Sequence, residues 1–220
     1  PNIRIIGKQA RGGSPFYIVA RKGAGMTTLQ DLKNKPVKLI VRERGSTGEF
    51  FANKLLRAHG ITYDDIKKRG GDVIFTSNSE AVSRMQDGHS DVWICIGAYP
   101  FGPVLELATA KGVVLIPYDR KIIDEFHRDY IFNIEEIAAK TYPGQDKPYV
   151  VNGSVDVWVT REDVPDMIIT AFLDSILKNE KEFRSVHRYA EGFDWKDSAS
   201  TPYLHRAAEK FYKDHGFLTK

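Results

Sequence analysis

The stretch PVKLIVRERGSTGEFFANKLL, residues 36–56, holds the arrangement that decides the fold. Residues 37–41 form a short apolar, β-branched run of the kind found in buried strands. Ser46 and Glu49 have the spacing of a helix-capping box, and the apolar residues 50, 51, 55 and 56 recur at helical spacing. The stretch therefore predicts a strand, a glycine-containing loop and a helix in direct succession.

Strand-like and helix-like segments alternate on both sides of this stretch. The run FYIVAR at residues 16–21 predicts a strand, and Thr27 or Thr28 starts a short helix that ends before Pro36. Further strands are expected at 73–75, 92–96 and 113–116, with helices from Ser79 and Pro103 between them. This alternation implies an α/β fold with a largely parallel sheet and helices on both faces.

The alternation of strand-like and helix-like segments ends after Ile137. The proline- and glycine-rich run TYPGQDKP, residues 141–148, leads into an alternating strand around 155–160. A long helix is expected from Asp163 or Pro165, and a shorter one at about His205 to Lys213.

Two sheets, and hence two lobes, are implied. The first lobe is predicted to comprise residues 1–35 and 149–220, and the second lobe residues 36–148. The segments Lys33–Pro36 and Tyr142–Pro148 are predicted to be the crossings between the lobes and to act as hinges.

Composition excludes several classes of protein. The net charge of +3 comes from 32 basic and 29 acidic residues scattered along the chain, so a nucleic-acid-binding stripe is not expected. No run approaches the roughly 20 apolar residues of a membrane-spanning helix, and the N-terminus lacks a basic-then-apolar export signal. Because the chain begins at Pro1, we expect that a segment upstream of it has been removed.

Cysteine and histidine patterns give no metal or cofactor site. The single cysteine, Cys95, excludes an internal disulfide, and its apolar neighbours predict a place in the core. The six histidines lack zinc-ligand spacing, and we predict neither a metal nor a cofactor. Nucleophile-elbow and dinucleotide motifs are also missing, so the chain is predicted to have no catalytic residues and not to be an enzyme.

Ligands of open α/β sheets bind at the carboxyl ends of strands, where helix N-termini point. The loop from Arg44 to Gly48 has this place, and its backbone N–H groups and hydroxyls suit a carboxylate or phosphate. Arg42 and Arg44 favour an anion, whereas Glu49 opposes one. The alternative is that Ser46 only caps the helix. The loop lacks the P-loop lysine pattern, which argues against a nucleoside triphosphate.

Two further segments follow predicted strands: Thr76–Ser79 and Gly97–Pro100. Each offers polar or backbone groups to a ligand, but turn and cap roles explain the same residues. Trp93, Tyr99, Tyr142 and Trp158 form either a cleft wall or part of the core. The predicted ligand-binding residues are Arg44, Gly45, Ser46, Thr47, Gly48, Ser77, Gly97, Tyr99 and Tyr142.

With these segments placed, the sequence resembles the TAXI branch of the TRAP-transporter solute-binding proteins. The resemblance is carried by YPGQDKP at 142–148 and VWVTREDVP at 157–165. It is supported by TLQDLK at 28–33, GSTG at 45–48 and MQDG at 85–88.

The resemblance implies the periplasmic-binding-protein-like type II fold, with two lobes that each hold a mostly parallel sheet flanked by helices. It also implies export to the periplasm or another extracytoplasmic compartment. There the protein would bind a small anionic or zwitterionic solute, a dicarboxylate or an amino acid, in an interlobe cleft. It would then deliver this solute to the membrane permease subunits of a TRAP transporter. The loops 45–48 and 97–100 would face the cleft from the second lobe.

Two departures from the family pattern stand out. Family members begin with a strand, a glycine-rich loop and a helix that this chain does not show, so its first lobe is predicted to be incomplete. The expected His-Pro-Gly-Ala reads His205-Arg206-Ala207-Ala208. The alternatives to a solute receptor are an enzyme or a ligand-sensing domain on the same scaffold.

The sequence yields one direct prediction. Replacing Arg44 with alanine is expected to weaken solute binding by about 1–3 kcal/mol, because a charge-assisted hydrogen bond is lost. Isothermal titration calorimetry measures this effect, and an unchanged affinity removes Arg44 from the site.

Overall fold

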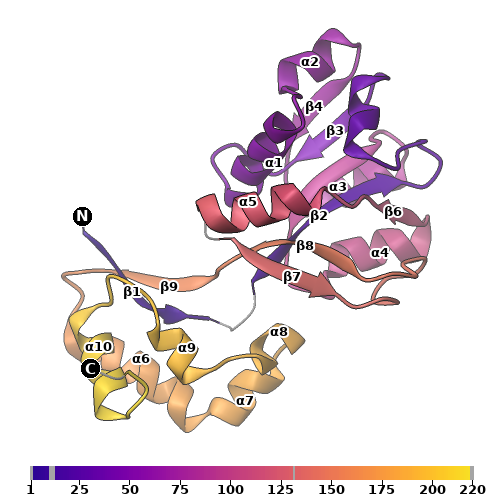
Figure 1. Ribbon diagram of the computed structural model, residues 1–220. Helices are drawn as coiled ribbons and strands as arrows, with labels where there is room; N and C mark the ends of the chain where they lie inside the picture. The colour runs from indigo at the N-terminus through magenta and orange to yellow at the C-terminus, as the bar shows by residue number, and fades with distance from the viewer. Residues whose placement is uncertain (1, 10–12, 131, 219–220) are drawn as a thin grey trace. The chain divides into compact units, whose positions relative to one another are not determined.

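The computed structural model describes residues 2–9, 13–130 and 132–218 (Figure 1). Its described residues fall into two compact units. Unit 1 comprises those within 1–13 and 155–220, and unit 2 comprises those within 14–154. Each unit has a hydrophobic core of its own.

Unit 2 is built on a seven-stranded sheet, as far as its described residues show, with the strand order β4-β3-β5-β2-β8-β7 and with β6 beside β2. The strands are β2 (Ser14–Arg21), β3 (Lys38–Val41), β4 (Asp72–Phe75), β5 (Val92–Ile96), β6 (Val113–Leu115), β7 (Asn133–Ile137) and β8 (Tyr149–Ser154). Strand β3 runs parallel to β4 and β5. Strand β2 is antiparallel to β5, β6 and β8, and β7 is antiparallel to β8.

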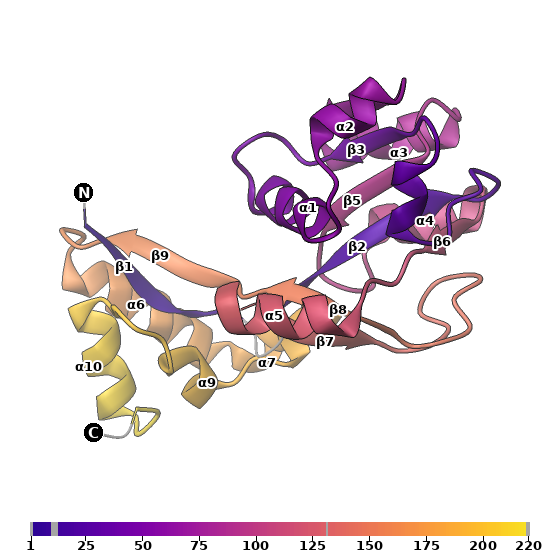
Figure 2. The same cartoon turned by 45° about the horizontal axis from the view of Figure 1, so that its top comes forward.

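Helices cover both faces of this sheet, with α1 and α5 on one face and α3 and α4 on the other (Figures 1 and 2). The helical segments of unit 2 are η1 (Leu29–Lys33), α1 (Thr47–Ala58), α2 (Tyr63–Lys68), α3 (Asn78–Gln86), α4 (Gly102–Ala110) and α5 (Arg120–Tyr130). Phe16 of β2 stacks on Phe51 of α1 with ring centroids 3.7 Å apart. Its neighbour Tyr17 stacks on Phe101 before α4, at 5.8 Å. Successive strand side chains point to opposite faces, so β2 contributes to the core on both sides of the sheet.

The predicted α/β class, with helices on both faces, is confirmed in unit 2. The share of parallel pairing is lower than predicted. Among the described strands of this sheet, only β4, β3 and β5 run parallel to a neighbour. Strand β2 lies against β5 in the opposite direction, and β7 and β8 form a hairpin. Cys95 lies in the core, fully buried on β5, as its apolar neighbours predicted.

The structure corrects the predicted crossings. Lys33–Pro36 and Tyr142–Pro148 both lie inside unit 2, and the units divide between residues 13 and 14 and between 154 and 155. Segment 33–36 connects β2 to β3, and segment 142–148 connects β7 to β8. The prediction placed β2 and β8 in the first lobe, but both strands pair within the unit 2 sheet.

Gln145 holds the 142–148 loop together. Its amide nitrogen donates to the carbonyls of Ile137, Ala138 and Lys147 at 3.0–3.2 Å. Its amide oxygen accepts from the N–H of Tyr142 at 3.2 Å. The motif thus forms an internally bonded turn of the β7–β8 hairpin.

Unit 1 contains an antiparallel strand pair and five helical segments among its described residues. They are β1 (Ile3–Lys8), β9 (Val157–Arg161), α6 (Asp166–Lys178), α7 (Glu180–Ser185), α8 (Arg188–Glu191), α9 (Trp195–Ala199) and α10 (Arg206–Asp214). The core packs Ile6 of β1 with Leu173 of α6 and with Trp195 and Phe211 of α9 and α10. The predicted long helix and final helix are confirmed as α6 and α10. In the described part of the chain, no helix is long and apolar enough to cross a membrane.

Replacing Gln145 with alanine is expected to lower the free energy of unfolding by about 1–3 kcal/mol, since one side chain satisfies four main-chain groups. Urea denaturation followed by circular dichroism measures the loss. The exposed neighbour Asp146 serves as the control, and its alanine variant is expected to stay within about 0.5 kcal/mol of the parent. Equal stability of the two variants would contradict the bracing role of Gln145.

Candidate functional site

The carboxyl ends of the parallel strands β4, β3 and β5 meet at one edge of the unit 2 sheet. The loop before α1 follows β3, Ser77 follows β4 and Gly97 follows β5. The fold therefore brings three of the predicted binding segments to the same edge. This edge is the usual place for a ligand in an open α/β sheet.

The start of α1 combines a cap with free donors. Ser46 is the N-cap, and its hydroxyl accepts from the N–H of Glu49 at 3.2 Å. The N–H groups of Thr47 and Gly48 lie in the first turn, where helical geometry provides no acceptor for them. The positive end of the helix dipole lies at the same place. Ser46 thus serves as a cap, and donors remain for an anion.

The two glycines of this loop are needed by the backbone. Gly45 has a φ of +80°, a conformation that side chains disfavour. A Cβ atom on Gly48 would lie 2.6 Å from Cγ of Arg42 and 3.3 Å from Ile96 of β5. Glycine at 48 therefore lets α1 begin close to the sheet.

A first hollow, which we call the α1 hollow, opens at this helix start. It has a volume of about 470 Å³ and is lined by Gly45, Ser46, Thr47, Phe50, Tyr130 and Phe132. Phe50 is 42% exposed although it is a large aromatic residue. Three predicted residues therefore share one hollow with three aromatic side chains.

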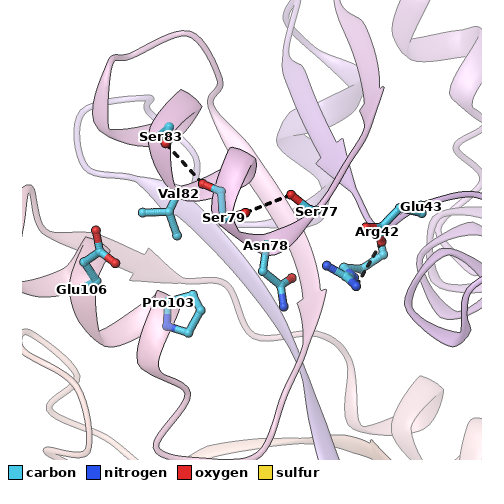
Figure 3. A pocket seen from close by; sticks show the side chains of 9 residues that line it. All are labelled: Arg42, Glu43, Ser77, Asn78, Ser79, Val82, Ser83, Pro103 and Glu106. Atoms are coloured by element: carbon cyan, nitrogen blue, oxygen red, sulfur yellow. Dashed lines mark hydrogen bonds and ion pairs between the residues drawn. The ribbon is translucent and has the colours of Figure 1, made fainter.

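A second hollow, the α3 hollow, lies at the start of α3 (Figure 3). Its volume is about 670 Å³, and its lining is Arg42, Glu43, Ser77, Asn78, Ser79, Val82, Ser83, Pro103 and Glu106. Ser77 caps α3 by accepting from the N–H of Glu80 at 3.3 Å. Its hydroxyl also lies 3.1 Å from that of Ser79. Of the predicted residues, this hollow contains Ser77.

The carboxylates near this edge are engaged by local partners. Glu43 pairs with Arg42 at 3.0 Å, and Glu49 accepts from the hydroxyl of Tyr63 at 3.1 Å. Glu80 accepts from the hydroxyl of Thr76 at 2.5 Å and from Arg84 at 2.8 Å. The hydrogen bond from Thr76, followed by the one from Arg84, holds the pKa of Glu80 below its ordinary value. Arginines therefore offset the charges of Glu43 and Glu80, whereas Glu49, bonded to a neutral hydroxyl, still opposes an anion.

Two cationic side chains, Arg44 before α1 and Lys54 within it, lie over aromatic rings. The guanidinium of Arg44 lies 3.8 Å from the ring centroid of Phe75. The ammonium of Lys54 lies 5.5 Å from the centroid of Phe50 and 5.4 Å from that of Tyr130. Across residues 2–9, 13–130 and 132–218, neither cation forms an ion pair. Their charge therefore remains available to a bound anion.

Arg44, Gly48 and the remaining predicted residues are not among the lining residues of either hollow. Gly97 donates its N–H to the carbonyl of Pro15 at 3.1 Å, and a Cβ there would lie 2.3 Å from the ring of Phe101. Tyr99 is half-buried. Trp93 is fully buried in the core, whereas Trp158 belongs to unit 1.

Tyr142 is 1% exposed. Its hydroxyl donates to that of Tyr17 at 3.0 Å and accepts from the N–H of Phe101 at 2.8 Å. Burial raises its pKa above the ordinary value. The structure therefore places this hydroxyl in the core of unit 2 rather than at the α1 or α3 hollow.

Sequence reasoning missed Phe50, Lys54, Tyr130 and Phe132. It assigned Phe50 together with Phe51 to the apolar face of one helix, yet adjacent helical residues point about 100° apart. That spacing was a usable signal, because Phe51 is fully buried and Phe50 is not. Tyr130 and Phe132 come from the end of α5 and the segment after it, and their approach to α1 has no local sequence signal.

Comparison with known protein families gives a match over nearly the whole chain. A model of the NMT1-like family matches residues 1–216. The chain belongs to the NMT1-like family.

Several solved structures resemble this family member at low identity. An ancestral arginine-binding protein bound to arginine has a TM-score of 0.46 and 14% identity, over 96% of this chain and 63% of that one. The periplasmic aliphatic sulphonate binding protein SsuA from Escherichia coli has a TM-score of 0.44 and 15% identity, over 97% and 59%. An ABC transporter periplasmic binding protein from Brucella ovis with glutathione bound has a TM-score of 0.42 and 13% identity, over 96% and 58%. The chain spans less than two thirds of the length of each.

Replacing Ser46 with alanine is expected to lower the free energy of unfolding by about 1 kcal/mol, because the N–H of Glu49 loses its acceptor. Asparagine at position 46 retains the cap and is the matched control, with stability close to that of the parent. Thermal or urea denaturation of the three proteins measures the difference. If the alanine variant is as stable as the parent, the cap contributes nothing measurable.

Proposed function

We propose that the chain is a non-catalytic solute receptor that binds a small carboxylate-bearing solute at the N-terminus of α1. The observation that carries the proposal is the first turn of α1, where Thr47 lines the α1 hollow and the N–H groups of Thr47 and Gly48 have no acceptor within the helix. A carboxylate has two oxygens, and adjacent backbone donors at a helix start suit such a group. Receptor proteins of this kind close around a solute and hand it to a membrane permease.

The charges around the hollow favour an anion. The helix dipole, Lys54 and Arg44 all contribute positive potential near the start of α1. Of the neighbouring carboxylates, Glu43 is offset by Arg42, and Glu49 accepts from the hydroxyl of Tyr63 and keeps its charge. An anionic or zwitterionic solute is therefore favoured over a cationic one.

The non-catalytic part of the proposal rests on the sequence, in which nucleophile-elbow and dinucleotide motifs are missing.

The finer parts of the proposal come from the sequence resemblance. They are a dicarboxylate or amino acid as the solute, permease subunits of the TRAP type, membership of the TAXI branch, and a periplasmic or other extracytoplasmic location. The proteins with similar structures are described by their arginine, sulphonate and glutathione ligands, and one is described as an ABC transporter protein. A test panel should therefore include amino acids and sulphonates besides dicarboxylates.

Replacing Thr47 with proline tests the site directly. Thr47 is the first residue of α1, where proline is well tolerated, and Ser46 before it already has the extended backbone that proline requires. The change removes one free N–H and leaves the helix intact. The affinity for a bound carboxylate is expected to fall about 10- to 100-fold, as for a lost charge-assisted hydrogen bond.

Calorimetry with glutamate, succinate and methanesulphonate first identifies a solute that binds the parent protein. The affinity of the same solute for the proline variant is then measured. Alanine at position 47 is the control, because it removes the hydroxyl and keeps the N–H. An unchanged affinity of the proline variant, with intact thermal stability, would place the carboxylate elsewhere. Failure of the entire panel to bind or to raise the melting temperature of the parent would count against the receptor.

A further inference from the structure

The walls of the α1 hollow are aromatic. Phe50 and Tyr130 meet edge to face with centroids 5.6 Å apart and an interplanar angle of 84°. Phe132 lies 6.0 Å from Tyr130 at an angle of 38°. All three residues line the hollow together with the loop that carries the free N–H groups. The hollow therefore combines an anion-binding end with aromatic surface.

These rings are held in place by the core behind them. Phe132 packs edge to face against Phe16 at 5.1 Å and against Phe51 at 5.8 Å. Tyr130 packs against Phe126 at 5.4 Å. Such support makes the aromatic surface a pre-formed one, as ligand pockets usually are.

Phe50 is the part of this surface that meets solvent. It is 42% exposed, while its neighbour Phe51 is fully buried. Aromatic surface that is left open beside a hollow with polar donors is typical of a ligand site. A ligand that covers Phe50 would remove this apolar area from water.

The charge of Lys54 decides which kind of aromatic contact the hollow can make. Three aromatic rings also suit a quaternary ammonium ion. Here the ammonium of Lys54 already lies over both Phe50 and Tyr130, at 5.5 and 5.4 Å. A second cation on the same rings would be repelled, whereas a neutral ring with an attached anion would not be.

We infer that the solute is an aryl carboxylate, a planar aromatic ring joined to a carboxylate through a short linker. The ring packs on Phe50, Tyr130 and Phe132, and the carboxylate accepts from the N–H groups at the start of α1, where Thr47 lines the hollow. This inference rests on the proposed function for the position of the carboxylate and adds the chemistry of the remainder of the solute. Aromatic pairs in offset or edge-to-face contact bind more tightly than their buried area alone explains.

The test compares three probes that differ only in the group beside the carboxylate. Phenylacetate carries a planar ring, cyclohexylacetate carries a saturated ring of similar size, and acetate carries none. Calorimetry or ligand-observed NMR on the 220-residue chain measures the three affinities. Phenylacetate is expected to bind about 3- to 10-fold more tightly than cyclohexylacetate, and acetate more weakly than both.

A pair of matched variants locates the ring. Replacing Phe50 with leucine removes the exposed ring and keeps apolar bulk, so phenylacetate should weaken about 3- to 10-fold while cyclohexylacetate changes less than about twofold. Phe172 of α6 in unit 1 is also a partly exposed phenylalanine, and its leucine variant is expected to bind both probes like the parent. Melting temperatures of both variants establish that they are folded.

The possible outcomes separate the inference from the proposed function. Equal binding of phenylacetate and cyclohexylacetate, or tighter binding of the saturated ring, would overturn the inference and leave the carboxylate site standing. Binding of benzyltrimethylammonium, but not of phenylacetate, would also overturn the inference, because the ammonium of Lys54 is expected to repel a second cation from the rings. If neither the three probes nor glutamate, succinate and methanesulphonate bind, the proposed function itself fails.

Discussion

The stacking of Phe16 on Phe51 is the contact on which the candidate site depends. It joins the central strand β2 to helix α1 with the rings 3.7 Å apart and nearly parallel. Both rings are fully buried and also contact Phe132, so the same cluster fixes the segment that follows α5. Once α1 is held in this way, the absence of a side chain at Gly48 lets its first turn approach Arg42 and Ile96 at the strand ends. The position of the helix donors is thus set by packing in the core of unit 2.

The sequence was sufficient for features that have a local cause. The strand and helix of residues 36–56 follow from residue pattern, and the capping hydroxyl of Ser46 follows from its spacing to Glu49. A full capping box would also have the Glu49 carboxylate accept from the N–H of Ser46. This part of the prediction was wrong, because the carboxylate accepts from the hydroxyl of Tyr63 instead. The direction in which β2 pairs with β5 has no local cause in the sequence. Whether β2 runs parallel or antiparallel to β5 depends on pairing across residues 16–96, and pattern alone cannot choose between the two.

The motif at 142–148 shows why a family resemblance and a binding site need not coincide. Its tyrosine hydroxyl and its glutamine amide satisfy groups of unit 2, including Tyr17, Phe101 and the main chain of the β7–β8 turn. These hydrogen bonds are requirements of the fold. The motif therefore identifies a way of building the sheet edge. The residues proposed to touch a solute belong instead to the loop before α1 and its first turn.

The distribution of charge at the strand ends follows the same logic. The carboxylates of Glu43, Glu49 and Glu80 each accept from a donor on a nearby side chain. The longer cationic side chains of Arg44 and Lys54 rest on aromatic faces, which hold a cation without neutralising it. Arg42 and Arg84 are paired with Glu43 and Glu80, whereas Arg44 and Lys54 form no ion pair among the described residues. Net charge counted from sequence cannot reveal this asymmetry, since it depends on which side chains are paired.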